Sequence, residues 1–198
     1  SDAAIVMIDL TNVNGQNITG ANAGLSDGNK HSISNWLGTG TGRLEIYSNY
    51  FNGDRYWGLD GDDEAGVFLD FAVNGSSFAS PRNFGASTTI DGSSTWTGSA
   101  NRTVFKYNSS TSPDFGAGSF MGFRFGSGSS WNYGYLEVTW NSTTNTFQIL
   151  SGAYESTANT SILAGATAAA VPGGGVSAMA LMALGGGAFR RRSRGRVA

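Results

Sequence analysis

Short runs in which apolar and polar residues alternate recur along most of the chain. In the run over residues 67–73, Val67, Leu69 and Phe71 share one face, and Asp70 falls on the opposite, outward face. Such alternation is what a β-strand with one buried face requires. Runs of the same character lie at residues 4–10, 43–47, 103–107, 119–125, 135–140 and 146–150, with a minor strand expected near residues 88–90.

Turn-forming residues separate these runs. Gly, Asn and Ser are concentrated in residues 12–15, 38–42 and 126–130, and these residue types favour turns and loops. No stretch before residue 165 repeats apolar residues at helical spacing. Many short strands joined by such turns predict an all-β body over residues 1–165, folded as an antiparallel β-sandwich or jelly roll.

The composition changes after Gly165. Residues 166–175 form an Ala- and Gly-rich linker that ends in the sequence VPGGG. Residues 176–198 begin with fourteen uncharged residues and end in an arginine cluster. Because Ala, Leu and Met are strong helix formers, this last segment is predicted to be a C-terminal hydrophobic helix followed by an Arg-rich tail.

The length of this apolar segment bears on how it meets a membrane. Fourteen residues are fewer than the about 20 that a helix needs to span the hydrocarbon core, although residues 168–171 extend the segment. Arginines mark the cytoplasmic side of membrane segments, so the cluster is expected to stay in the cytoplasm while the β body is translocated. A disordered, adhesive C-terminus is the alternative interpretation.

Three elements of this tail follow one another closely. They are the dipeptide Val171-Pro172, the hydrophobic segment 176–189 and the cluster of Arg190, Arg191 and Arg192. The arrangement resembles the PEP-CTERM sorting signal of bacterial surface proteins that exosortases process. Gly173 stands where that family usually has an acidic residue, so the chain looks like a glycine variant of the signal. The resemblance implies secretion, a membrane-associated precursor, recognition by a sorting enzyme and a final extracellular or cell-surface location.

Stretches upstream of the tail extend the resemblance. FMGFRF at residues 120–125, YGYLEV at 133–138, GAYES at 152–156 and ILAG at 162–165 look like the last strands common in such proteins. Their aromatic residues are most simply core and cross-strand contacts. Arg124 and Glu155 are expected to form a partly buried ion pair that fixes the register of these strands.

Composition narrows the classes of function. The chain has no Cys and one His, which excludes disulfide scaffolds, thiolate zinc sites and iron–sulfur clusters. Residues 1–165 hold seven basic and all fourteen acidic residues, a net charge of −7, whereas the tail holds five Arg and no acid. The sequence therefore offers no basic stripe on the body for a nucleic acid partner.

The densest acidic cluster contains four carboxylates, those of Asp60, Asp62, Asp63 and Glu64. It is expected to be a solvated acidic turn, but closely spaced carboxylates in one loop are also ligands that Ca²⁺ accepts. The spacing does not match an EF-hand loop. Calcium is the one cofactor that the sequence suggests, with these four residues as its candidate ligands.

Aromatic residues crowd the segment before this cluster. Tyr56 and Trp57 are the candidates for stacking on a sugar ring, because exposed aromatic faces beside Asp and Asn suit lectin chemistry. No Glu lies in a hydrolase signature, and His31 has no nucleophile elbow or oriented Asp beside it. No catalytic residue is assigned, and an enzyme is not expected.

Together these features predict a non-enzymatic, secreted cell-surface or extracellular-matrix structural protein with a PEP-CTERM-like sorting tail. Its low-charge surface suits crowded packing, since few like charges oppose neighbouring copies, and self-assembly into a filament or layer is expected. The alternative is a surface-anchored carbohydrate-binding, lectin-like module whose partners are glycans.

Overall fold

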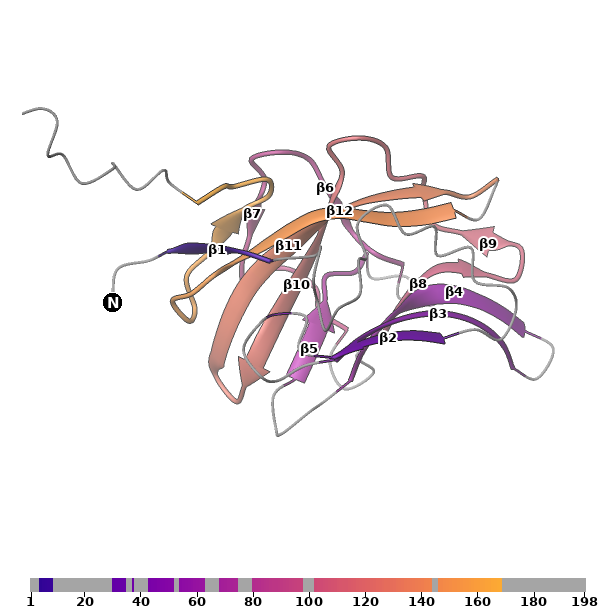
Figure 1. Cartoon of the computed structure of the whole chain (residues 1–198), viewed down its shortest axis with the longest axis horizontal. Helices are drawn as coiled ribbons and strands as arrows, with labels where there is room; N and C mark the ends of the chain where they lie inside the picture. Colours follow the sequence, from indigo (N-terminus) through magenta and orange to yellow (C-terminus); the bar gives the residue numbers. More distant parts are fainter. Residues whose placement is uncertain are drawn as a thin grey trace, which may run out of the picture. The chain divides into compact units, whose positions relative to one another are not determined.

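Two antiparallel sheets and a short ribbon make up the described part of the chain (Figure 1). The computed structural model describes residues 4–8, 30–34, 37, 43–51, 54–62, 68–74, 80–97, 102–143 and 146–168. The chain divides into two units, residues 1–168 and 169–198, and the second lies outside the described residues. The hydrophobic helix and the sorting motif therefore stay predictions.

The first sheet has six strands in the order β1-β12-β11-β10-β5, with β6 paired to the start of β10. Their bounds are β1 (Ile5–Met7), β5 (Phe68–Phe71), β6 (Asn83–Phe84), β10 (Phe120–Ser127), β11 (Ser130–Asn141) and β12 (Thr146–Glu155). β10, β11 and β12 are neighbours in both sequence and space, so they form a meander. Its register shifts between Glu137 and Val138, where the pairing passes over Leu150 of β12.

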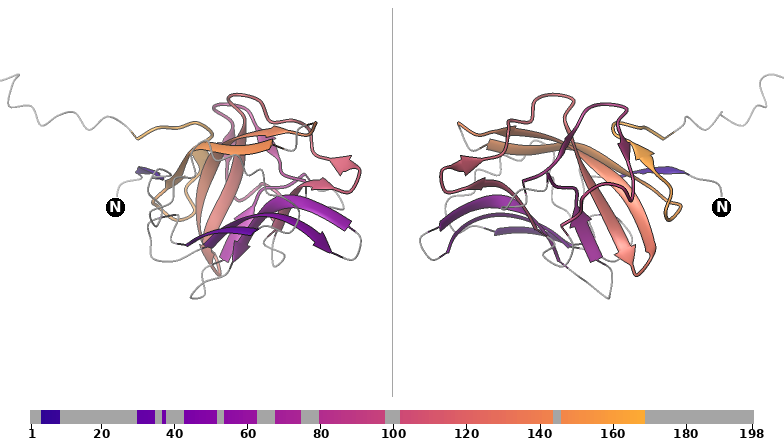
Figure 2. Two further views of the ribbon diagram at one scale, coloured as in Figure 1. Left: turned by 45° about the vertical axis from the view of Figure 1, so that its right-hand side comes forward. Right: turned by 180° about the vertical axis from the view of Figure 1, so that it is seen from behind.

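The second sheet has five strands in the order β2-β3-β4-β8-β9. Their bounds are β2 (Lys30–Ser34), β3 (Arg43–Phe51), β4 (Asp54–Asp62), β8 (Arg102–Tyr107) and β9 (Ser110–Thr111). A separate ribbon pairs β7 (Thr89–Ile90) with β13 (Ile162–Leu163). Figure 2 shows the two sheets from two further sides.

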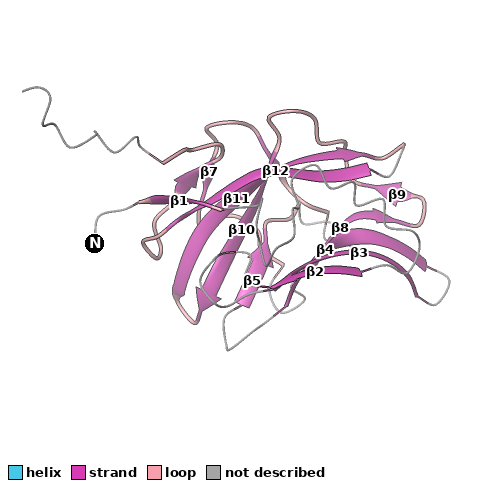
Figure 3. Ribbon diagram, in the orientation of Figure 1, coloured by secondary structure: helices cyan, strands magenta, loops and turns pink. Residues whose placement is uncertain are grey.

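The described residues contain strands, turns and loops but no helix (Figure 3). Every strand pair among them is antiparallel. The structure thus confirms the predicted all-β class and its antiparallel sheets. The sandwich-like contact is the main core, in which Leu44, Leu59 and Phe105 of the second sheet join residues of β5, β10, β11 and β12.

The first sheet is buried on both of its faces. One face contributes Leu69, Phe123 and other residues to the main core. The opposite face, called the outer face here, carries a second core that the ribbon and β6 help to cover. This second core contains Ala72, Phe84, Ile90, Phe120, Tyr133, Tyr135, Ala153, Ile162 and Ala164. Burial on both sides explains why the central strands β10 and β11 contain so few exposed positions.

This double burial corrects the expectation that Asp70 faces solvent. Asp70 does lie on the opposite face from Leu69 and Phe71, as the alternation requires, but it is only 2% exposed. The prediction was wrong because alternation identifies the face of a residue and not what covers that face. Asp70 is a buried carboxylate on the outer face.

The C-terminal end of the body is fastened to the outer face. The backbone N–H of Ala164 donates to the carbonyl of Thr88 at 2.9 Å. The hydroxyl of Tyr135, a 2% exposed residue, donates to the carbonyl of Ala166 at 2.6 Å. These bonds hold the chain against the sheet up to Ala166.

Replacing Tyr135 with phenylalanine is expected to lower the free energy of unfolding by about 1 kcal/mol, because the Ala166 carbonyl loses its donor. Urea denaturation followed by fluorescence measures the change. Tyr154→Phe is the matched control, since no described residue accepts a hydrogen bond from the Tyr154 hydroxyl. Equal losses in both variants would contradict a specific role for the Tyr135 bond.

Candidate functional site

An arginine lies between two tryptophans on the outer face of the first sheet. The group comprises Asp70, Trp96, Arg124, Trp131 and Tyr133, and is named the arginine–tryptophan cluster. Strands β5, β10 and β11 place Asp70, Arg124 and Tyr133 in one cross-strand row. Trp131 lies near the start of β11, and Trp96 lies in the segment after β7 that pairs with Ala72. Three strands and one loop therefore converge on this cluster.

The guanidinium group of Arg124 makes contacts of two kinds. Its Nε donates to Oδ2 of Asp70 at 2.8 Å, and its Nη2 lies 2.6 Å from the same oxygen. Its Cζ lies 4.0 Å from the ring centroid of Trp131 and 5.0 Å from that of Trp96. Both distances are within the range of cation–π attraction. The Trp96 ring also lies 5.8 Å from the ring of Tyr133.

Two hydrogen-bond donors of the cluster have no acceptor among the described residues. Nε1 of Trp96 is buried without a hydrogen-bond partner. Nη1 of Arg124 donates to no described residue, and 18% of that side chain is exposed. Trp96 Nε1 is shielded from solvent, so of the two donors it is the partly exposed Arg124 that can donate to an oxygen atom outside the chain.

Burial raises the pKa of Asp70 above its ordinary value of 3.8, and the hydrogen bonds and charge of Arg124, together with Thr97, oppose that rise. Desolvation is the larger effect because the carboxylate is removed from water. Asp70 is the one carboxylate of the cluster. Glycoside hydrolysis requires two carboxylates.

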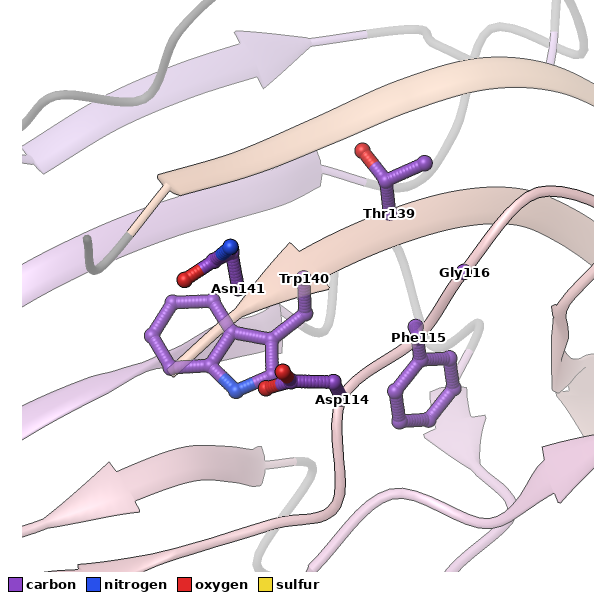
Figure 4. Close-up of a pocket in the computed structure, with 6 residues that line it drawn as sticks. All are labelled: Asp114, Phe115, Gly116, Thr139, Trp140 and Asn141. Carbon is purple, nitrogen blue, oxygen red and sulfur yellow. The ribbon is translucent and has the colours of Figure 1, made fainter. Parts of the chain in front are cut away.

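A second feature is a hollow of about 300 Å³ beside β11. Figure 4 shows its lining: Asp114, Phe115 and Gly116 come from the loop before β10, and Thr139, Trp140 and Asn141 come from β11. Two backbone hydrogen bonds, of 2.9 and 3.0 Å, join Phe115 to Trp140. Both side chains are 2% exposed, so their rings belong to the main core.

Asp114 stands at the rim of this hollow. Its Oδ1 accepts the N–H of Ser142 at 2.8 Å, and that backbone bond lowers the pKa of Asp114 below its ordinary value. Asp114 is the one carboxylate among the described residues of the lining.

The acidic cluster at residues 60–64 is only partly described. Asp60, Gly61 and Asp62 end strand β4, so the expected turn is wrong for these three residues. The reason is that pairing with β3 continues through all three residues. Gly61 also lies close to β5, since a Cβ there would be 2.6 Å from the carbonyl oxygen of Leu69. Asp63 and Glu64 lie outside the described residues.

The possible calcium site stays a prediction. No group of three or more His, Cys, Asp or Glu side chains among the described residues is placed to hold a metal ion. In the register, Asp60 lies between Glu45 of β3 and Arg102 of β8.

The remaining predicted site residues have side chains that lie outside what is described. Tyr56 and Trp57 lie in β4, opposite Asn49 and Ser48 of β3, but their side chains lie outside what is described. Val171, Pro172, Gly173, Arg190, Arg191 and Arg192 lie outside the described residues. The sugar-stacking residues and the sorting motif therefore stay predictions.

The expected Arg124–Glu155 ion pair is wrong. Arg124 pairs with Asp70 instead, because β10 lies directly beside β5 while Glu155 belongs to β12, on the far side of β11. Glu155 is 3% exposed, and its Oε1 accepts the N–H groups of Ala4 at 3.0 Å and Thr157 at 2.9 Å. The Glu155 carboxylate therefore holds the chain at the start of β1, and it is not the partner of Arg124.

Within the described ranges, no helix is long and apolar enough to cross a membrane. Comparison of the chain with protein-family models, with curated proteins and with solved structures finds no match.

Proposed function

We propose that the chain is a non-enzymatic, secreted structural protein of a bacterial cell surface or extracellular matrix. In this proposal the β body is the functional part outside the cell, and the PEP-CTERM-like tail directs it there. A sorting enzyme and the membrane are the partners of the tail. Further copies of the chain are the partners of the body, in a filament or layer.

The observation that carries the proposal is the position of the motif relative to the folded body. The stretches that extend the resemblance fall on the neighbouring strands β10, β11 and β12 and on β13. Among the described residues, the last bond of the body to the sheet is at Ala166, and the motif begins at Val171. Cleavage at the motif would leave every described strand intact.

The distribution of charge gives independent support. The body carries −7 and the tail carries five Arg without an acid. A positive cluster after an apolar segment favours retention of that end in the cytoplasm. Five described carboxylates accept hydrogen bonds from the chain itself, which supports a non-enzymatic body: Asp70, Asp91, Asp114, Glu137 and Glu155.

The edges of the second sheet provide a physical basis for assembly. Within the described sheet, β2 pairs only with β3 and β9 pairs only with β8. A strand paired on one side presents backbone groups that can pair with another chain. Such pairing does not need a hydrophobic interface.

The sorting proposal is tested by expressing the full chain in bacteria with and without an exosortase. The expected result is loss of the tail and release of the body only where the enzyme is present, measured by intact mass spectrometry of cell fractions. Pro172→Ala and a triple Arg190, Arg191 and Arg192 to Ala variant should block processing. Ser193→Ala is the control that should not.

An intact tail in every strain, with the body in the cytoplasm, would overturn the proposal. Electron microscopy of the processed body tests assembly separately. Isolated particles at all concentrations would overturn the filament or layer without affecting the conclusion on sorting.

A further inference from the structure

We propose that the outer face of the first sheet binds a neutral saccharide at the exposed end of the arginine–tryptophan cluster. The site is made by Phe68, Gly126 and Trp131, with Arg124 in the next row. None of these residues belongs to the predicted sugar site at Tyr56 and Trp57, and the proposal does not depend on the sorting tail.

The first argument is the alignment of two aromatic rings. Phe68 of β5 pairs with Gly126 of β10, and Gly126 pairs with Trp131 of β11. The two aromatic residues are thus two strand spacings apart, roughly 10 Å between their Cα atoms. Phe68 is 40% exposed and Trp131 is partly exposed. A single exposed apolar residue needs no explanation, so the argument rests on the alignment of Phe68 with Trp131 in one row.

The second argument is the glycine between them. Gly126 has φ of +150°, and a Cβ at this position would overlap the carbonyl oxygen of Ser130. The β10–β11 hairpin therefore requires glycine there for backbone reasons. As a result, among the described strands β5, β10 and β11, Phe68 and Trp131 are the side chains of this row, with no side chain between them.

The third argument is the supply of hydrogen-bonding groups. Arg124 is two residues before Gly126 and so lies in the next row on the same face. Its Nη1 donates to no acceptor among the described residues. Trp96 Nε1 is shielded from solvent, so it is Arg124, with 18% of its side chain exposed, that can donate to a ligand. Sugar rings combine an apolar face, which stacks on aromatic rings, with hydroxyl oxygens, which accept from such donors.

The charge of the site selects a neutral sugar. The positive charge of Arg124 is already matched by Asp70 at 2.6 Å, so the pair has no net positive charge to offer an acidic ligand. The net charge of −7 on the body also repels polyanions. A flat apolar protein partner would cover Arg124 and Asp70 without accepting a hydrogen bond from the Arg124 guanidinium, and burying that donor unpaired costs binding energy. The saccharide fits these constraints best.

The test measures binding of hexasaccharides to the full chain by calorimetry and tryptophan fluorescence. Neutral probes are cellohexaose, laminarihexaose and maltohexaose, and hexagalacturonate is the acidic counterpart. The expected result is binding of at least one neutral probe, weakened about tenfold by Phe68→Ala and by Trp131→Phe. Thermal unfolding checks that both variants fold.

Leu150→Ala is the matched control, because Leu150 is 39% exposed on the same sheet. It lies beside Glu137 and Val138, six residues along β11 from Trp131, which is roughly 20 Å. Affinity should be unchanged in this variant. The proposal is overturned if no neutral probe binds at millimolar concentration, if hexagalacturonate binds more tightly, or if Leu150→Ala weakens binding as much as Phe68→Ala.

Discussion

Replacing Arg124 with methionine is expected to lower the free energy of unfolding by about 3 kcal/mol at neutral pH. The substitution keeps most of the side-chain length but leaves Asp70, which is 3% exposed in its side chain, without a counter-charge. Removing one partner of a buried ion pair costs about 3–5 kcal/mol. We expect a loss at the lower end of this range because 18% of the Arg124 side chain is exposed to solvent. Urea denaturation monitored by tryptophan fluorescence measures the loss.

Arg82→Met is the matched control for this experiment. The guanidinium of Arg82 also lies over an aromatic ring, 4.5 Å from the centroid of Phe84, but no ion pair within hydrogen-bond distance is described for it. Its loss is expected to be about 0.5–1 kcal/mol, the range of an exposed cation–π contact. Equal effects of the two substitutions would show that stacking, rather than the ion pair with Asp70, is what matters.

The pH dependence of the Arg124→Met variant follows from the pKa of Asp70. Burial raises that pKa in the folded chain above 3.8, so the folded state holds the proton more tightly than the unfolded state. The contribution of Asp70 to stability is therefore complete below about pH 3.8 and falls as the pH rises through the folded-state value. Arg124 lowers the pKa of Asp70. Its loss should therefore raise the folded-state pKa further and widen the pH range over which stability changes. The deficit of the variant should accordingly shrink when unfolding is measured near pH 4 instead of pH 7.

Most strand positions follow from side-chain patterns that are local in sequence. The runs at residues 103–107 and 119–125 fall within or largely within β8 and β10, because their alternating residues face one core or the other. β4 was not predicted as a strand, since Asp and Gly are depleted in strands and make up a large share of its nine residues. β12 extends beyond its predicted run because the shift at Leu150 reverses the alternation.

The arginine–tryptophan cluster could not have been predicted in the same way. Asp70 and Arg124 are 54 positions apart, and their contact depends on β5 pairing with β10 in one particular register. The sequence does show Asp70 at an outward strand position and Arg124 within FMGFRF. Either side chain, however, could equally have faced water. Which strand lies beside β10 decides the partner, and that is a property of topology rather than of local sequence.

Replacing Trp140 with alanine is expected to cost about 3–5 kcal/mol of stability, the range for truncating a large buried aromatic side chain. Trp140 is 2% exposed, and its ring centroid lies 5.4 Å from that of Phe105. Through this contact it connects β11 of the first sheet to β8 of the second. Denaturant unfolding measures the loss. Far-ultraviolet circular dichroism is expected to show that the antiparallel sheets stay in place, because the substitution reduces only the main core.

Trp140→Phe separates the role of the ring from that of its size. Phenylalanine preserves an aromatic contact with Phe105 but leaves part of the indole volume empty, so its cost should be well below that of alanine. The same two variants distinguish the hollow beside β11 from the outer-face site. Because Trp140 faces the main core and Trp131 the outer face, Trp140→Phe should lower stability while leaving hexasaccharide affinity unchanged. If Trp140→Phe instead weakened the sugar and left stability intact, the binding site would lie in the hollow of Asp114 and Trp140, and the assignment to Phe68 and Trp131 would fail.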